Sequence, residues 1–214
     1  MNILTDQLPT AIRVNDKVYE INSNFRDCLR IIMAFEDNEL TDFEKKVVLV
    51  NGLYQEMPDS RDIPSAIRQG VKFLDGGNDK PEEEGHGLRL FSFTHDARFV
   101  FSAFQQTHGI DLQNTEYMHW WQFMTLFMDI GSETFFSNLV SLRKRVKTGK
   151  ASKEEKQVAR EMGSVFEVPE IDTRSIEERE LERTFMNRVK AARERKKVLN
   201  VRSSSLSSML LERE

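Results

Sequence analysis

The stretch 120-WWQFMTLFMDI-130 is the longest apolar run in the chain, and its pattern predicts a central helix from about Thr115 to Asp129. Its apolar residues recur at helical spacing and form one stripe, made of Trp120, Phe123, Met124 and Phe127. Because adjacent residues of a helix point about 100° apart, only one tryptophan can lie at the centre of that face. Two interpretations of Trp121 stay open. It packs in the core beside Met128, or it contacts a partner at an interface, where tryptophan is enriched.

Five further segments carry apolar residues at helical spacing. Capping signals place their N-termini at Ser23 or Asn24, at Thr41, at about Pro64, at Thr94 and at Ser132. Glycines provide stops at Gly76 and Gly109, and the last of these helices extends to about Lys147. The expected buried stripes are Phe25, Leu29, Ile32 and Met33 in the first helix, and Phe43, Val47, Val50 and Tyr54 in the second.

Residues 11–21 alternate loosely between apolar and polar side chains around Asn15-Asp16, which predicts a β-hairpin. An isolated hairpin is only marginally stable in water, so this one must pack on the helices or pair with another chain. The fold class is therefore mainly α, with a helical core domain and a small N-terminal hairpin over residues 1–148.

The composition changes after Gly149. Residues 149–172 read as a short polar helix, begun by the capping box at Ser152 and ended at Gly163, followed by a linker at Pro169. A second box at Ser175 opens an extended charged helix within residues 173–200. Its thin apolar stripe makes Leu181, Phe185 and Val189 candidate partner-binding residues, because so polar a helix is exposed or awaits a partner. Residues 201–214 are expected to be a disordered tail.

The composition fits a core joined to a segment that buries little. Apolar residues make up 39% and charged residues 31% of the chain, against about 45–50% and about 25% in typical domains. The single cysteine, Cys28, excludes a disulfide within the chain and is expected to be a packed thiol. The N-terminal sequence lacks the features of a signal peptide, and no apolar run approaches the ~20 residues of a membrane span. We therefore expect a cytosolic protein without membrane contact.

No arrangement of residues indicates catalysis, and we expect a protein that is not an enzyme. The four histidines, His86, His95, His108 and His119, show no metal-binding spacing. Gly85-His86-Gly87 is too short for a phosphate loop, and no Gly-x-Ser-x-Gly motif is present. Carboxylates are abundant, but nothing marks two of them as an acid and base pair. No metal, cofactor or catalytic residue is therefore assigned.

The basic run Arg188 to Lys197 leaves nucleic-acid binding open as an alternative, since such a run can bind phosphate backbones. The net charge of −4 and the pI of about 5.7 do not favour it. Aromatic residues that could stack on bases are absent from the run. Binding of a protein helix is the preferred interpretation of this segment.

Three motifs resemble the bacteriophage gene-product-fifteen family of phages and prophages of Gram-positive bacteria. They are FTHDARFVFSAF at 93–104, GIDL at 109–112 and HWWQF at 119–123, and the opening from Leu4 through the hairpin to Arg26 is similar too. The resemblance covers roughly residues 1–198, and its most specific part is the His-Trp-Trp block after Gly-Ile-Asp-Leu. The family offers no catalytic residues to carry over.

The resemblance implies a function in tail assembly. Family members are generally encoded between the major tail protein and the tape measure protein, a position that implies a tail assembly chaperone. Such a protein acts in the host cytoplasm, binds the tape measure, assists assembly of the tail tube and self-associates, with the major tail protein as a further possible partner. Two alternatives stay open, a tail completion or connector protein retained in the virion, and a nucleic-acid-binding accessory protein.

Overall fold

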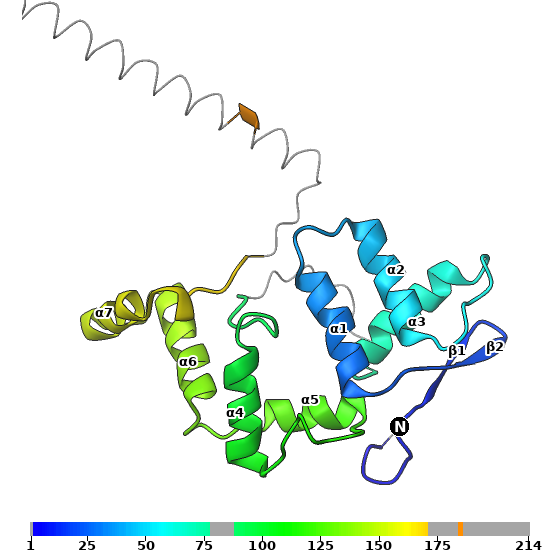
Figure 1. Ribbon diagram of the computed structural model, residues 1–214, viewed down its shortest axis with the longest axis horizontal. Helices are drawn as coiled ribbons and strands as arrows, with labels where there is room; N and C mark the ends of the chain where they lie inside the picture. Colours follow the sequence, from blue (N-terminus) through cyan, green and yellow to red (C-terminus); the bar gives the residue numbers. More distant parts are fainter. Residues whose placement is uncertain (1, 78–87, 171–183, 186–214) are drawn as a thin grey trace, which may run out of the picture. The chain divides into compact units, whose positions relative to one another are not determined.

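A computed structural model describes residues 2–77, 88–170 and 184–185. The chain divides into a compact unit, Met1–Ile171, and a second unit, Asp172–Glu214. Among the described residues, the first unit holds one β-hairpin and seven α-helices (Figure 1). This confirms the prediction of a mainly α fold with a small N-terminal hairpin. The predicted loop at 78–87, the tail at 201–214 and nearly all of the helix at 173–200 lie outside the described residues.

The elements follow one another in a simple order. They are β1 (Ala11–Val14), β2 (Lys17–Glu20), α1 (Phe25–Glu36), α2 (Asp42–Leu53), α3 (Ile63–Leu74), α4 (Ala97–His108), α5 (Trp120–Met128), α6 (Phe135–Lys147), α7 (Lys153–Met162) and a short 3-10 turn (Gly163–Val165). No helix in the described part of the chain has the length and apolar character needed to cross a bilayer.

The hairpin packs on the helices, as one of the two predictions for it required. Strands β1 and β2 are antiparallel with Val14 opposite Lys17, and Asn15 begins the two-residue turn with a φ of 52°. The inward-facing residues Ile12, Val14 and Tyr19 are buried, and β1 contacts α3. The hairpin is therefore part of the main core.

Several helix caps are those that the sequence predicts. Asn24 accepts a hydrogen bond from the backbone N–H of Arg26, and capping boxes start α2 at Thr41 and α7 at Ser152. Helix α4 ends at Gly109 in the left-handed conformation, with a φ of 66°. Each of these side chains or glycines satisfies backbone groups that a helix end leaves unpaired.

Three predicted starts are wrong. Helix α4 begins directly after Asp96 and not after Thr94. The Asp96 side chain does not cap the helix, because its carboxylate binds Arg143. Helix α6 is capped by Thr134 and not Ser132, with the Thr134 hydroxyl accepting from the Ser137 N–H at 3.2 Å. Helix α5 begins at Trp120, about five residues later than predicted, because the backbone of His119 forms a β-bridge with Asn24.

The buried faces of α1 and α2 differ from the predicted stripes. Helix α1 buries Cys28 and Ile31 beside Phe25, whereas Leu29 and Ile32 are half-buried and Met33 is 37% exposed. In α2, Val50 and Tyr54 are buried as predicted, but Phe43 is 75% and Val47 38% exposed. Each helix carries two adjacent apolar rows, and periodicity alone does not say which row faces the neighbours. The neighbours decide: α1 packs on α2 and α5, and α2 packs on α1 and α3.

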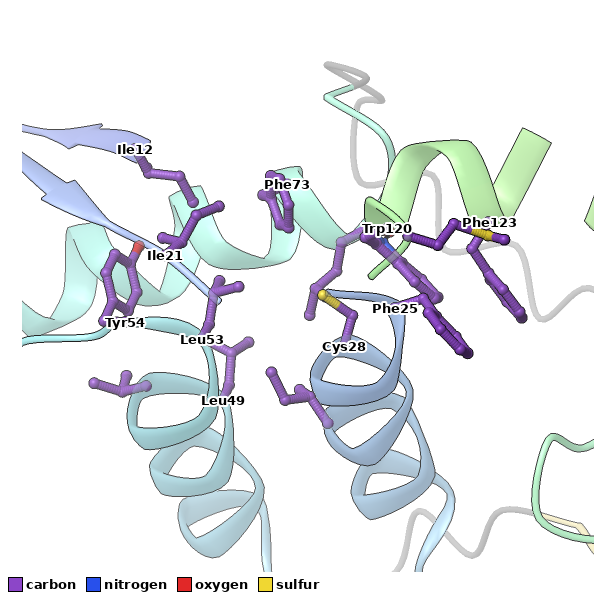
Figure 2. Close-up of a cluster of buried hydrophobic side chains, with 14 of the residues drawn as sticks. Ile12, Ile21, Phe25, Cys28, Leu49, Leu53, Tyr54, Phe73, Trp120 and Phe123 are labelled. Atoms are coloured by element: carbon purple, nitrogen blue, oxygen red, sulfur yellow. Dashed lines mark hydrogen bonds between the residues drawn. The ribbon is translucent and has the colours of Figure 1, made fainter. Parts of the chain in front are cut away.

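The core is continuous from the hairpin to α5. Figure 2 shows it running from Ile12 and Tyr54 through Leu53 and Cys28 to Phe123. Phe123 is fully buried at the centre of an aromatic stack, with ring centroids 5.2 Å from Phe25, 4.9 Å from Phe104 and 5.6 Å from Trp120. The apolar run at 120–130 therefore forms the central helix, as its pattern predicts.

Candidate partner-binding surfaces

The two adjacent tryptophans at the start of α5 bind the end of α3. The indole N–H of Trp120 donates to the carbonyl of Leu74 at 2.9 Å, and that of Trp121 donates to the carbonyl of Phe73 at 2.7 Å. Both carbonyls belong to the last turn of α3, where a helix leaves carbonyl groups without partners of its own. That of Phe73 also accepts from the backbone N–H of Gly76 at 3.0 Å. Trp120 is 3% exposed. The pair of tryptophans thus holds α3 and α5 together.

Trp121, the predicted contact residue, is half-buried within its own chain. Its ring stacks on Phe73 with centroids 5.6 Å apart. Gly77 lies so close that a Cβ there would be 2.8 Å from Trp121 Cη2, and the backbone of Gly77 has a φ of 80°. The outer part of this indole remains accessible, so partner contact by Trp121 stays a prediction beside its role in packing.

His119 fixes the start of α5. Its Nδ1 accepts from the backbone N–H of Trp121 at 3.1 Å, so the proton is assigned to Nε2, which donates to the carbonyl of Pro9 at 3.0 Å. Burial lowers the pKa of His119, and the hydrogen bond to Pro9 opposes this only in part. The imidazole is therefore a neutral cap, and it lies edge-on to Phe73 and Trp121.

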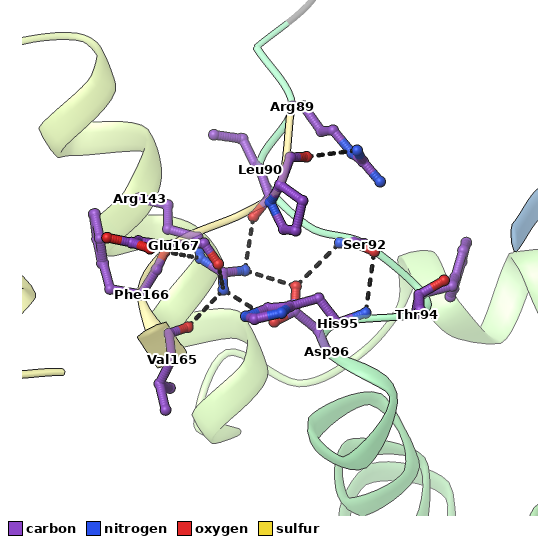
Figure 3. A network of polar contacts seen from close by, with 12 residues as sticks. Arg89, Leu90, Ser92, Thr94, His95, Asp96, Arg143, Val165, Phe166 and Glu167 are labelled. Carbon is purple, nitrogen blue, oxygen red and sulfur yellow. Dashed lines mark hydrogen bonds and ion pairs between the residues drawn. The ribbon is translucent and has the colours of Figure 1, made fainter. Parts of the chain in front are cut away.

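A buried ion pair between α4 and α6 organises the other half of the domain (Figure 3). Arg143 and Asp96 are both fully buried, and the guanidinium meets both carboxylate oxygens, at 2.7 Å and 2.9 Å. Arg143 also donates to the carbonyls of Leu90, Val165 and Phe166 at 2.7 to 3.0 Å. All three nitrogen atoms of this guanidinium thus donate hydrogen bonds within the chain. The ion pair therefore acts as a structural link.

The segment after α7 is held by further polar contacts. Glu36 accepts from the hydroxyl of Ser92 at 2.6 Å and pairs with Arg89 at 3.1 Å. Arg89 in turn donates to the carbonyl of Pro169 at 2.6 Å, and Asn38 donates to that of Glu170 at 3.0 Å. The predicted linker around Pro169 therefore lies against α1 and the segment before α4.

The three candidates of the charged helix fall in the second unit. Phe185 is helical and 63% exposed, as a partner-binding residue would be. Leu181 and Val189 lie outside the described residues. Whether these three side chains form one binding stripe therefore stays a prediction.

The described residues offer no group of three or more His, Cys, Asp or Glu side chains that could hold a metal ion. Cys28 is buried, and burial raises the pKa of its thiol to about 12. Since the thiolate is the nucleophilic form of cysteine, this thiol is suited to packing and not to attack on a substrate.

Sequence reasoning missed the Arg143–Asp96 pair, although a signal was present. Arg143 lies seven residues after Phe136 and four after Leu139, on the row that α6 buries. A charged residue on an apolar row is either turned to solvent or paired in the interior. The partner, 47 positions earlier in the chain, could not be found from spacing.

A family model described as Bacteriophage Gp15 protein matches residues 4–168. The chain belongs to the Bacteriophage Gp15 protein family. The matched range runs from before the hairpin to the 3-10 turn and its carbonyls that bind Arg143, so family membership covers the first structural unit. Gp15 membership marks a bacteriophage structural or assembly protein. No curated protein and no solved structure matches the chain.

Proposed function

We propose that this Gp15 protein is a tail assembly chaperone. It binds the tape measure protein in the host cytoplasm, keeps that protein soluble and assists polymerisation of the tail tube, with the major tail protein as a further partner. The observation that carries the proposal is the match of the Gp15 family to residues 4–168, together with the genomic position that the resemblance implies.

The proposed mechanism is stoichiometric binding without turnover. A chaperone of this kind needs a stable body with apolar surface left open for a partner. Met128 and Phe185 are more than 60% exposed on this chain, so each is accessible to a partner. We propose accordingly that the protein is not an enzyme.

The alternative, a tail completion or connector protein, differs in its fate. Quantitative mass spectrometry of purified virions and of the infected-cell lysate separates the two. The proposal predicts abundant protein in the lysate and none in the virions. A fixed copy number per particle would contradict it and favour the structural alternative.

Binding to nucleic acid is tested in parallel by titrating double-stranded DNA at several salt concentrations. A protein that neutralises several phosphates loses affinity steeply as salt rises. The proposal predicts no such binding at physiological salt.

A further inference from the structure

An apolar groove lies between α1 and α4, and we refer to it as the α1–α4 groove. Two apolar rows at i, i+4, i+8 spacing form its walls, Phe25, Leu29 and Met33 on α1, and Phe93, Ala97 and Phe101 along α4 and the residues before it. The buried side chains of Val100 and Phe123 form the floor, and the groove encloses about 300 Å³.

The arrangement of three helices explains why this groove stays open. Helix α5 contacts both α1 and α4, and its Phe123 fills the space beneath them. Arg26 ties the start of α1 to the loop after α4 by donating to the carbonyls of Leu112 and Thr115, at 2.7 Å and 2.6 Å. At the other end Glu36 binds Ser92. These contacts fix the spacing between the two walls at both ends of the groove.

The groove follows α1 from Phe25 to Met33. Met33 also lines a second hollow of about 720 Å³, which continues past Leu40, Thr94 and Pro169. A helix of 12 residues, such as α1, is about 18 Å long. A partner helix of about two turns would contact apolar side chains between Phe25 and Met33. Beyond Met33 the second hollow is lined by polar and charged residues that include Glu36 and Asp37.

The charges on the groove are of one sign. Arg26 and Arg30 are the charged residues that line it. The carbonyl groups bound by Arg26 leave its positive charge uncompensated, and the Arg30 side chain is 71% exposed although it pairs with Asp27. Positive charge at the rim of an apolar groove favours a partner with acidic residues beside its apolar stripe.

We propose that the α1–α4 groove binds an amphipathic α-helix whose large apolar side chains are flanked by acidic residues. This is the helix-in-groove mode, in which side chains at i, i+3, i+4 and i+7 anchor a helix in an apolar groove. The inference rests on the proposed function, since under that function the helix belongs to the tape measure protein.

The test uses two variants of the groove and one matched control. Met33→Glu places a carboxylate on one wall, and Ala97→Trp fills the groove from the exposed first residue of α4. Val47→Glu is the control, because Val47 is 38% exposed on α2 and Met33 is 37% exposed on α1. Thermal unfolding of each variant checks that it folds.

Each full-length variant is co-expressed with the tape measure protein of the same phage, and the retained tape measure is quantified after affinity purification. We expect Met33→Glu and Ala97→Trp to retain about tenfold less than wild type, the loss typical of an interface centre, and Val47→Glu to match wild type. In hydrogen exchange of the wild-type complex, residues 25–36 and 97–104 should become protected.

The outcomes separate the two proposals. Equal retention by wild type and all three variants, without protection of α1 and α4, overturns the groove assignment and leaves the chaperone function standing. No retention by wild type overturns both. Equal loss in Met33→Glu and Val47→Glu, with folding intact, also contradicts the groove, since it would place binding on apolar surface in general.

Discussion

At the scale of single residues, the Arg143 side chain links several segments of the domain through hydrogen bonds. It is fully buried, pairs with Asp96 and binds three backbone carbonyls from two distant segments. Removing one partner of such a pair leaves an uncompensated buried charge, which costs about 3–5 kcal/mol. We therefore predict that Arg143→Leu lowers the free energy of unfolding by about this amount, as measured by urea denaturation.

The control lies two residues away on the same helix. Arg145 pairs with Glu155 at 2.8 Å, but both side chains are partly exposed. Exposed pairs contribute about 0–1 kcal/mol, so Arg145→Leu should change stability by no more than that. Similar losses in the two variants would show that the Arg143–Asp96 pair contributes little to the fold.

Cys28 makes stability depend on pH in the alkaline range. Its thiol has an ordinary pKa of 9.0, and burial raises the pKa to about 12 in the folded protein. Above pH 9 the unfolded chain loses this proton while the folded chain keeps it. The contribution of Cys28 to stability is thus full below pH 9 and is lost as the pH rises toward about 12.

We predict that Cys28→Ala reduces the fall in the free energy of unfolding between pH 8 and pH 10. Other groups, including Tyr54, whose pKa is also raised by burial, are present in both proteins and cancel in the comparison. Parallel pH profiles for wild type and variant would contradict a buried, protonated Cys28.

Single residues also show where prediction from sequence stops. Periodicity identified Trp120 and Phe123 as core, because both lie on one helical row. It could not show that the indoles of Trp120 and Trp121 bind Leu74 and Phe73, since this depends on where α3 ends in space. Arg143 and Asp96 were missed for the same reason.

At the scale of elements, the junction of α3 and α5 depends on Gly77. This residue has a positive φ, and a Cβ there would lie 2.8 Å from the Trp121 ring. Gly109 also has a positive φ, but nothing lies within 4 Å of its Cβ position. At both positions the backbone conformation would strain an alanine, but only at Gly77 would the added methyl group meet a neighbouring side chain.

We predict that Gly77→Ala is more destabilising than Gly109→Ala. A left-handed backbone costs alanine about 1–2 kcal/mol at both sites, and overpacking adds about 1–3 kcal/mol at Gly77 alone. Gly77→Ala should also shift the tryptophan emission, because Trp121 must move. Equal losses, with unchanged emission in both variants, would show that Trp121 does not pack on Gly77.

The hairpin offers the predicted route to self-association by strand addition. In a two-residue hairpin the pair beside the turn, here Val14 and Lys17, is hydrogen-bonded, so the next pair, Arg13 and Val18, turns its backbone groups outward. Val18 also has a side chain that is 58% exposed. On this outer side the carbonyl of Glu20 already accepts from the backbone N–H of Gln55 at 3.1 Å. Val18 is therefore the position of β2 that is available to a second chain.

We predict that Val18→Pro abolishes self-association without unfolding the protein, because proline removes an outward N–H and no bond of the hairpin. Val18→Thr, which keeps the N–H, is the control. Both are preferable to deleting the hairpin, since a deletion removes buried residues such as Ile12. An unchanged oligomer mass in Val18→Pro, measured by light scattering, would refute association through this edge.

Elements were predictable where a local signal decides them. The capping boxes at Thr41 and Ser152 and the stop at Gly109 need only neighbouring residues. The predicted starts at Thr94, Ser132 and about Thr115 were wrong, because tertiary contacts chose among several polar residues and placed the caps at Asp96, Thr134 and His119. The apolar row of α1 that faces the α1–α4 groove was taken for core for a related reason, since a groove wall and a core face have the same periodicity.

At the scale of the whole molecule, the sequence predicted the fold class and the family, and the match to residues 4–168 confirmed the latter. The groove could not be predicted, because it arises from the spacing of α1 and α4 above α5. The described unit combines a rigid aromatic core with open apolar surface, which supports the proposal of a protein that acts by binding.

The most direct test of the central proposal is co-expression of this protein with the tape measure protein of the same phage. The tape measure expressed alone serves as the control for solubility. The proposal predicts that the tape measure becomes soluble and co-purifies with several copies of this protein in a fixed ratio. A tape measure that still precipitates, with none bound to the purified protein, would contradict the chaperone function.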